Sequence, residues 1–174
     1  MFERYTEAAR LTLFIARHIA SKTGSSYIES EHLLMGVLVA DQGLARRFFG
    51  SPLAAEDVWK KIELSKPIRE PVLKPIDLPL ANKSKRVLAY GAEEAERLFN
   101  RHIGPEHLLL GLFREEKGFA AQLLHEYGLD LESVRRGLKL TPYKESPPND
   151  ISETQARIRR MLSNSGPGLP PQVE

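Results

Sequence analysis

The chain has 174 residues, no cysteine, and 25 lysine and arginine residues against 23 aspartate and glutamate residues, a formal net charge of +2. This length allows one compact domain, or two very small ones that share a core, and it excludes a multi-domain machine. The missing cysteines exclude disulfides, thiolate metal sites and thiol nucleophiles, and the nearly balanced charge argues against a dedicated nucleic-acid-binding protein.

Proline positions divide the chain into parts. Prolines cluster at residues 67–79 and again at 142–171. Because proline lacks a backbone donor and clashes with the preceding helical turn, neither stretch is a helix interior. We predict one domain over residues 1–140 and a flexible tail over 141–174. Within the domain, the predicted parts are a first unit (1–65), a stiff linker (66–79) and a second unit (80–140).

Apolar residues at helical spacing predict four helices in each unit. The first helix has Thr6 as a suitable N-cap, Glu7 in its first turn, and Gly24 as a stop signal. No segment alternates with period two, so we predict an all-α protein. The predicted helices, in chain order, lie near residues 5–22, 31–40, 42–49, 54–64, 80–98, 106–116, 118–126 and 130–139. In the tail, residues 151–162 predict one short amphipathic helix.

The two units are copies of one pattern at an offset of 75 residues. The segment Ile28-Glu-Ser-Glu-His-Leu-Leu-Met-Gly36 matches Ile103-Gly-Pro-Glu-His-Leu-Leu-Leu-Gly111, and after Phe49 a one-residue insertion continues the match. Neither unit is long enough to bury much surface alone. We therefore predict two four-helix repeats related by a pseudo-twofold axis, packed face to face around one aliphatic core.

The repeated Glu-His-Leu-Leu motif has a structural and a functional interpretation. Glu31 and Glu106 lie at predicted helix starts, where the helix dipole favours a carboxylate, and the leucines point into the core. Glycines at 36 and 111 predict a close helix crossing, since glycine inside a helix is otherwise destabilising. We expect the histidines to cap and pack. The glutamates either do the same or face a ligand.

The sequence lacks the usual catalytic motifs, including a phosphate-binding loop, a dinucleotide fingerprint and a His-Glu-x-x-His metal site. We expect no enzyme activity, no metal and no cofactor. The basic pairs along the chain are scattered, which favours solvated faces, although a regulatory helical protein that binds nucleic acid is the alternative. No apolar run is long enough to span a membrane and no secretory signal is visible, so we expect a cytoplasmic protein.

The doubled motif, with Phe2-x-Arg-Tyr-Thr-Glu-x-Ala near the start of the chain, resembles the N-terminal domain of Clp ATPases of the ClpC/ClpA type. The resemblance covers roughly residues 2–139. It implies a non-catalytic module that binds substrate or adaptor proteins of a Clp ATPase, or modulates that ATPase. Its partners would be proteins, with no nucleic acid and no membrane.

The resemblance also implies phosphoarginine or peptide binding at Thr6, Glu31 and Glu106. In the related domains each repeat offers a glutamate from its Glu-His motif and a threonine at the start of its first helix. Carried over, the first pocket keeps Thr6 and Glu31. The second keeps Glu106 but has Ala81 in place of threonine, and Pro105 removes one amide donor. The resemblance therefore implies one competent pocket at most.

Overall fold

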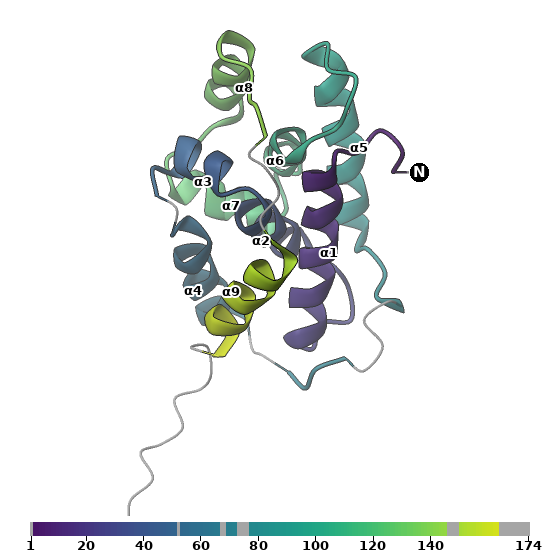
Figure 1. Cartoon of the computed structure of the whole chain (residues 1–174), viewed down its shortest axis with the longest axis vertical. Coiled ribbons are helices and arrows are strands. Elements are labelled where there is room, and N and C mark those ends of the chain that lie inside the picture. The colour runs from purple at the N-terminus through teal and green to yellow at the C-terminus, as the bar shows by residue number, and fades with distance from the viewer. Residues whose placement is uncertain (1, 52, 67–68, 73–76, 146–149, 164–174) are drawn as a thin grey trace, which may run out of the picture.

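The computed structural model describes residues 2–51, 53–66, 69–72, 77–145 and 150–163. Within these ranges the chain forms nine helices and no strands, so the predicted all-α class is confirmed. Four helices form the first unit, four form the second, and one follows (Figure 1). They are α1 (Glu7–Lys22), α2 (Ser30–Ala40), α3 (Gln42–Phe49), α4 (Ala54–Ser65), α5 (Asn82–Arg97), α6 (Pro105–Arg114), α7 (Phe119–Glu126), α8 (Leu131–Leu140) and α9 (Ile151–Ser163).

Each unit is built on a close crossing between its first two helices. A methyl group at Gly36 of α2 would collide with the carbonyl oxygen of Thr12 in α1. In the second unit a methyl group at Gly111 of α6 would collide with the carbonyl oxygen of Val87 in α5, and Val87 is the position equivalent to Thr12. The predicted reason for keeping both glycines is thus confirmed: each allows two helix backbones to touch.

Backbone hydrogen bonds join the two units. The Thr6 amide donates to the Ile103 carbonyl over 3.0 Å, and the Ala81 amide donates to the Ile28 carbonyl over 3.0 Å. These two bonds are equivalent under the 75-residue offset, which is the signature of the predicted pseudo-twofold relation. The start of the first helix in each unit is therefore fixed beside the motif helix of the other unit.

One aliphatic core runs through both units. The leucine pair of each motif is at most 1% exposed, and α2 contacts α6 directly. Truncating one such leucine to alanine typically removes about 2–5 kcal/mol of folding free energy. The motif leucines therefore fix α2 and α6 at the centre of the domain, with their N-termini near the surface.

The helix α9 changes the picture of the tail. The predicted short helix is present, but it is packed rather than loose: Ile158 is 1% exposed and Met161 is 6% exposed. The Arg157 guanidinium pairs with Glu56 of α4, with Nε and Oε1 3.0 Å apart. In Figure 1, α9 lies beside α4. The prediction of a flexible tail is thus wrong for this helix, because its apolar edge finds a partner; residues 164–174 lie outside the described part.

The linker residues that the structure describes are also held against the domain. The Arg69 and Val72 amides donate to the carbonyls of Thr23 and Ser21 over 3.0 and 2.9 Å, and Leu78 is 8% exposed. These contacts fix Arg69 and Val72 against the C-terminal end of α1. None of the helices in the described ranges is long and apolar enough to cross a bilayer.

Candidate functional site

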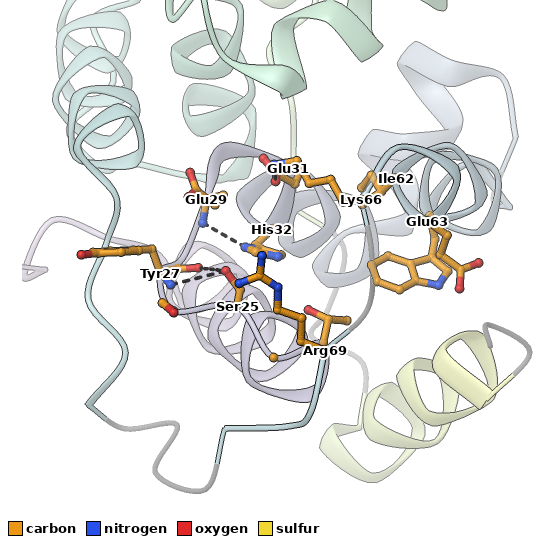
Figure 2. A pocket seen from close by; sticks show the side chains of 13 residues that line it. Ser25, Tyr27, Glu29, Glu31, His32, Ile62, Glu63, Lys66 and Arg69 are labelled. Atoms are coloured by element: carbon orange, nitrogen blue, oxygen red, sulfur yellow. Dashed lines mark hydrogen bonds and ion pairs between the residues drawn. The ribbon is translucent and has the colours of Figure 1, made fainter. Parts of the chain in front are cut away.

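Each unit has a hollow at the N-terminus of its motif helix. The first encloses about 370 Å³ between the end of α1, the start of α2 and the end of α4 (Figure 2). The second encloses about 110 Å³ between the end of α5, the start of α6 and the end of α8. Part of their walls corresponds at offsets of 75 and 76, including Glu31 with Glu106 and Ile62 with Leu138. The repeat has therefore duplicated a concave site as well as a fold.

In the first hollow, the Glu31 carboxylate holds a cation from the chain itself. Glu31 is 2% exposed, and its Oε1 makes an ion pair with the ammonium of Lys66, the residue after α4. The same ammonium lies 5.3 Å from the ring centroid of Phe119. Figure 2 shows the Lys66 side chain reaching Glu31 from the end of α4. A buried carboxylate needs such a partner, because ionisation without one is costly.

In the second hollow, the equivalent Glu106 pairs with no cation among the described residues, and Nδ1 of the neutral His107 lies 3.3 Å from its Oε1. Its Oε2 is buried without a hydrogen-bond partner. The pKa of Glu106 is raised to about 7, mainly by burial and also by the nearby carboxyls of Glu145 and Asp41, against one backbone hydrogen bond that lowers it. Glu106 therefore exchanges its proton near neutral pH, which suits a group that can meet either a neutral or a cationic ligand.

The structure regroups the three predicted site residues. Thr6 was predicted to share a pocket with Glu31, but its amide pairs with Ile103, three residues before Glu106. Ala81 instead pairs with Ile28, three residues before Glu31. Because the backbone pairing is exchanged between units, threonine lies beside the second motif and alanine beside the first. The backbone pairing thus places Thr6 beside the motif of Glu106, while a pocket shared by Thr6 and Glu31 stays a prediction.

The Thr6 hydroxyl has two local roles. Its Oγ1 accepts from the Ala9 amide over 3.1 Å and caps α1, as predicted. The same side chain hydrogen-bonds to the carboxyl of Glu145, whose pKa is raised mainly by burial and lowered by this bond. At Ala81 no side-chain cap is present. The Thr6 side therefore has one more polar group to offer than its counterpart.

The motif histidines are structural. The Glu29 amide donates to Nδ1 of His32 and the Gly104 amide donates to Nδ1 of His107, both over 2.9 Å. Burial lowers the pKa of each histidine to about 4, so both imidazoles are neutral at physiological pH. This confirms their predicted role as caps. Among the residues with assigned positions, no group of three acidic, histidine or cysteine side chains is arranged to hold a metal ion.

The basic pairs are engaged within the fold. Arg47 donates to the carbonyls of Gly137 and Thr141 over 2.8 and 2.7 Å. Arg135 pairs with the fully buried Glu94, with Nη2 and Oε1 2.7 Å apart. These two arginines therefore hold helices together, whereas the sequence predicted solvated faces for the basic pairs.

Two site residues were missed from the sequence, Lys66 and Glu145. Each lies in the segment that leaves the fourth helix of its unit, and each brings a charge to the glutamate of its own motif. A signal existed: both follow the last apolar residue of an amphipathic helix, where the chain must turn back over the motif helix. Under the 76-residue offset Lys66 corresponds to Pro142 and Glu145 to Arg69, so the repeat itself does not pair the two residues.

The fold and the hollows define a class: a double four-helix repeat with a concave, carboxylate-bearing site in each repeat. Residues 4–59 and 80–165 match the family described as the Clp repeat (R) N-terminal domain. The chain belongs to this family, as the resemblance implied.

Named relatives agree with this assignment. The chain is 36% identical over 136 residues to the ATP-dependent Clp protease ATP-binding subunit ClpA homolog of Guillardia theta, covering 78% of this chain and 16% of that protein. It is 35% identical over 137 residues to the chloroplastic chaperone protein ClpC1 of Arabidopsis thaliana, covering 78% and 14%. The chain thus spans less than a fifth of these relatives.

The fold agrees with a solved structure. The N-terminal domain of the Clp-associated chaperone ClpD from Arabidopsis thaliana superposes with a TM-score of 0.61 at 24% identity, covering 91% of this chain and 97% of that one. At this identity the likeness concerns the fold alone.

Proposed function

We propose that this chain is a non-catalytic protein-binding module that recognises substrates or adaptors of a Clp ATPase–protease system, or modulates that ATPase. Its family membership supports this, since the relatives that share the domain are named as subunits of Clp proteases and chaperones. The proposal places the chain in the cytoplasm, because it would share a compartment with such an ATPase.

The observation that carries the proposal is the pair of buried carboxylates at equivalent helix starts, one of which already holds a side-chain cation. Glu31 and Lys66 show that the site accepts a cation on an aliphatic stem. A guanidinium would use both oxygens of such a carboxylate, and a protein ligand supplies it as arginine.

Phosphoarginine is the ligand that we propose for the site at Thr6 and Glu106. Glu106 would pair with the guanidinium. The Thr6 hydroxyl and the first amides of α1 suit a phosphoryl group, because a helix N-terminus favours an anion. At Glu31 the missing hydroxyl of Ala81 leaves only the carboxylate. The proposed site is thus assembled from both units.

Calorimetry with phosphoarginine and with arginine tests the ligand. We expect Glu106→Gln and Thr6→Ala to weaken phosphoarginine binding by about tenfold each, the loss of one charge-assisted hydrogen bond. The control is Glu96→Gln, which removes an exposed carboxylate that pairs with Arg4. Equal affinities for all four proteins, or no binding by any of them, would overturn the phosphoarginine proposal.

Affinity purification of the tagged chain from its native cell tests the broader function. We expect a Clp ATPase, its peptidase or an adaptor to be enriched with the wild type over a Glu31→Ala, Glu106→Ala double variant. Enrichment of nucleic acid instead, with a binding constant that falls steeply with salt, would support the alternative function.

A further inference from the structure

We propose that the site at Thr6 and Glu106 is closed by the chain itself. The segment 141–145, here called the strap, leaves α8 and brings the Glu145 carboxyl to the place that an anionic ligand group would take. The ligand part of this inference rests on the proposed function, whereas the closure stands on contacts within the chain.

The strap is held at its start and in its middle. At its start, Nη2 of Arg47 donates to the Thr141 carbonyl over 2.7 Å. In its middle, Tyr143 is half-buried and packs against the core. Beyond it, α9 is anchored on the first unit through Ile158. The strap therefore follows a set path across the start of α6.

Glu145 converges on the same point as Glu106. A side chain at Gly104 would collide with the Glu106 carboxyl and would lie 2.8 Å from Oε1 of Glu145. The two carboxyls thus flank one glycine, immediately before α6. The Thr6 hydroxyl bonds to Glu145 from the other side, so the carboxyl uses the hydroxyl that we assign to a ligand.

The charges around Glu145 make the closure of the site depend on pH. Besides Glu106, the acidic groups that face it are Asp41, between α2 and α3, and Glu7 of α1. His102, before α6, opposes them by lowering the pKa of Glu145, and the neighbouring His107 is neutral. Three of these carboxyls each have a buried oxygen without a hydrogen-bond partner: Asp41, Glu106 and Glu145.

Such a cluster holds together best while it carries a proton. Like-charged carboxyls at close range cannot all ionise without repulsion, and burial raises the pKa of both Glu106 and Glu145. The acidic forms can donate to the neighbouring oxygens. As the pH rises through about 7, the range where Glu106 ionises, repulsion works against the docked strap. The strap therefore opens towards alkaline pH.

The first unit has the same device with the opposite charge. The ammonium of Lys66, the residue that leaves α4, pairs with the Glu31 carboxylate. The Lys66 side chain is 46% exposed, so the ammonium can leave Glu31 without being buried elsewhere. Both exit segments thus return to the glutamate of their own motif.

Paramagnetic relaxation measures the closure directly. The chain has no cysteine, so Lys144→Cys gives a single attachment point for a spin label on an exposed strap residue. We expect strong broadening of the Thr6 and Gly104 amide signals at pH 5.5 and at least a twofold weaker effect at pH 8.5. In a Glu145→Gln background, which has no charge to repel, broadening should be equal at both pH values. Absent broadening at pH 5.5, or an identical pH response in both backgrounds, would overturn the proposal.

Ligand binding tests the consequence of closure. If the strap is open about a tenth of the time, Glu145→Ala should bind phosphoarginine about tenfold more tightly than the wild type. Equal binding by both would overturn the gating role even if the strap is docked. If neither protein binds while the label shows closure, phosphoarginine is the wrong ligand and the proposed function fails separately from the strap.

Discussion

Gly24 and Phe99 occupy equivalent positions in the two units, and both have a positive φ, +73° and +58°. The turn after the first helix of each unit therefore requires a left-handed residue, which glycine adopts freely and phenylalanine does not. Phe99 is also 95% exposed, so its ring stabilises nothing within the domain.

Replacing Phe99 by glycine should therefore stabilise the fold. We expect Phe99→Gly to raise the free energy of unfolding by about 1 kcal/mol, the strain of a left-handed non-glycine residue. Gly24→Ala is the matched comparison and should destabilise, because its methyl group would collide with the Glu70 carbonyl. Urea denaturation measures both. A destabilised Phe99→Gly would show that the ring has a structural contact after all.

The helix crossings give a second comparison. Gly111→Ala should destabilise the domain by roughly 2–4 kcal/mol, since the new methyl group forces α5 and α6 apart. Gly137→Ala, in α8, should instead stabilise by about 0.5–1 kcal/mol, because its methyl group would meet nothing closer than 3.8 Å and alanine favours a helix. Thermal unfolding of the two variants should shift in opposite directions, and equal shifts would contradict the crossing.

Because the pKa of Glu106 is raised, replacing it by its neutral isostere glutamine should stabilise the fold by an amount that depends on pH. The folded chain binds the proton more tightly than the unfolded chain, so Glu106 destabilises the fold increasingly as pH rises from 4.5 to about 7. Glu106→Gln should stabilise by roughly 1–3 kcal/mol at pH 8 and change little at pH 4. Urea midpoints at the two pH values test this. A gain that is the same at both would show that ionisation is not its cause.

The lowered pKa values of His32 and His107 predict that the two histidines destabilise the fold increasingly as pH falls. The unfolded chain takes up protons below pH 6.5 while the folded chain resists until about 4, so stability is lost across this window as pH falls. His107→Gln should flatten the loss by roughly 1–3 kcal/mol. His125→Gln, at an exposed position of α7, is the matched control for the substitution itself.

Much of this molecule could be predicted from its sequence because local rules and the repeat agree. Thr6 caps the first helix, the motif leucines are buried, and Gly36 and Gly111 allow close crossings. These features depend on neighbours within a few residues or on helical spacing, and the second copy repeats the buried leucines and the close crossing.

The composition of the site could not be predicted in the same way. The partner of Thr6 is set by a backbone hydrogen bond to Ile103. Nothing in the sequence around Thr6 specifies which unit supplies the segment that accepts this bond. The charges of Lys66 and Glu145 likewise matter only because their segments return over the motif helices. Long-range placement of irregular segments depends on tertiary packing that no periodicity records.

The reciprocal pairing at Thr6 with Ile103 and at Ala81 with Ile28 also limits how the domain can be divided. A chain cut at the linker would leave each half with a motif helix but without the helix start that pairs with the backbone just before that helix. The proposed site at Thr6 and Glu106 would then be divided between the two halves. A change at either helix start would therefore act across the boundary between the units.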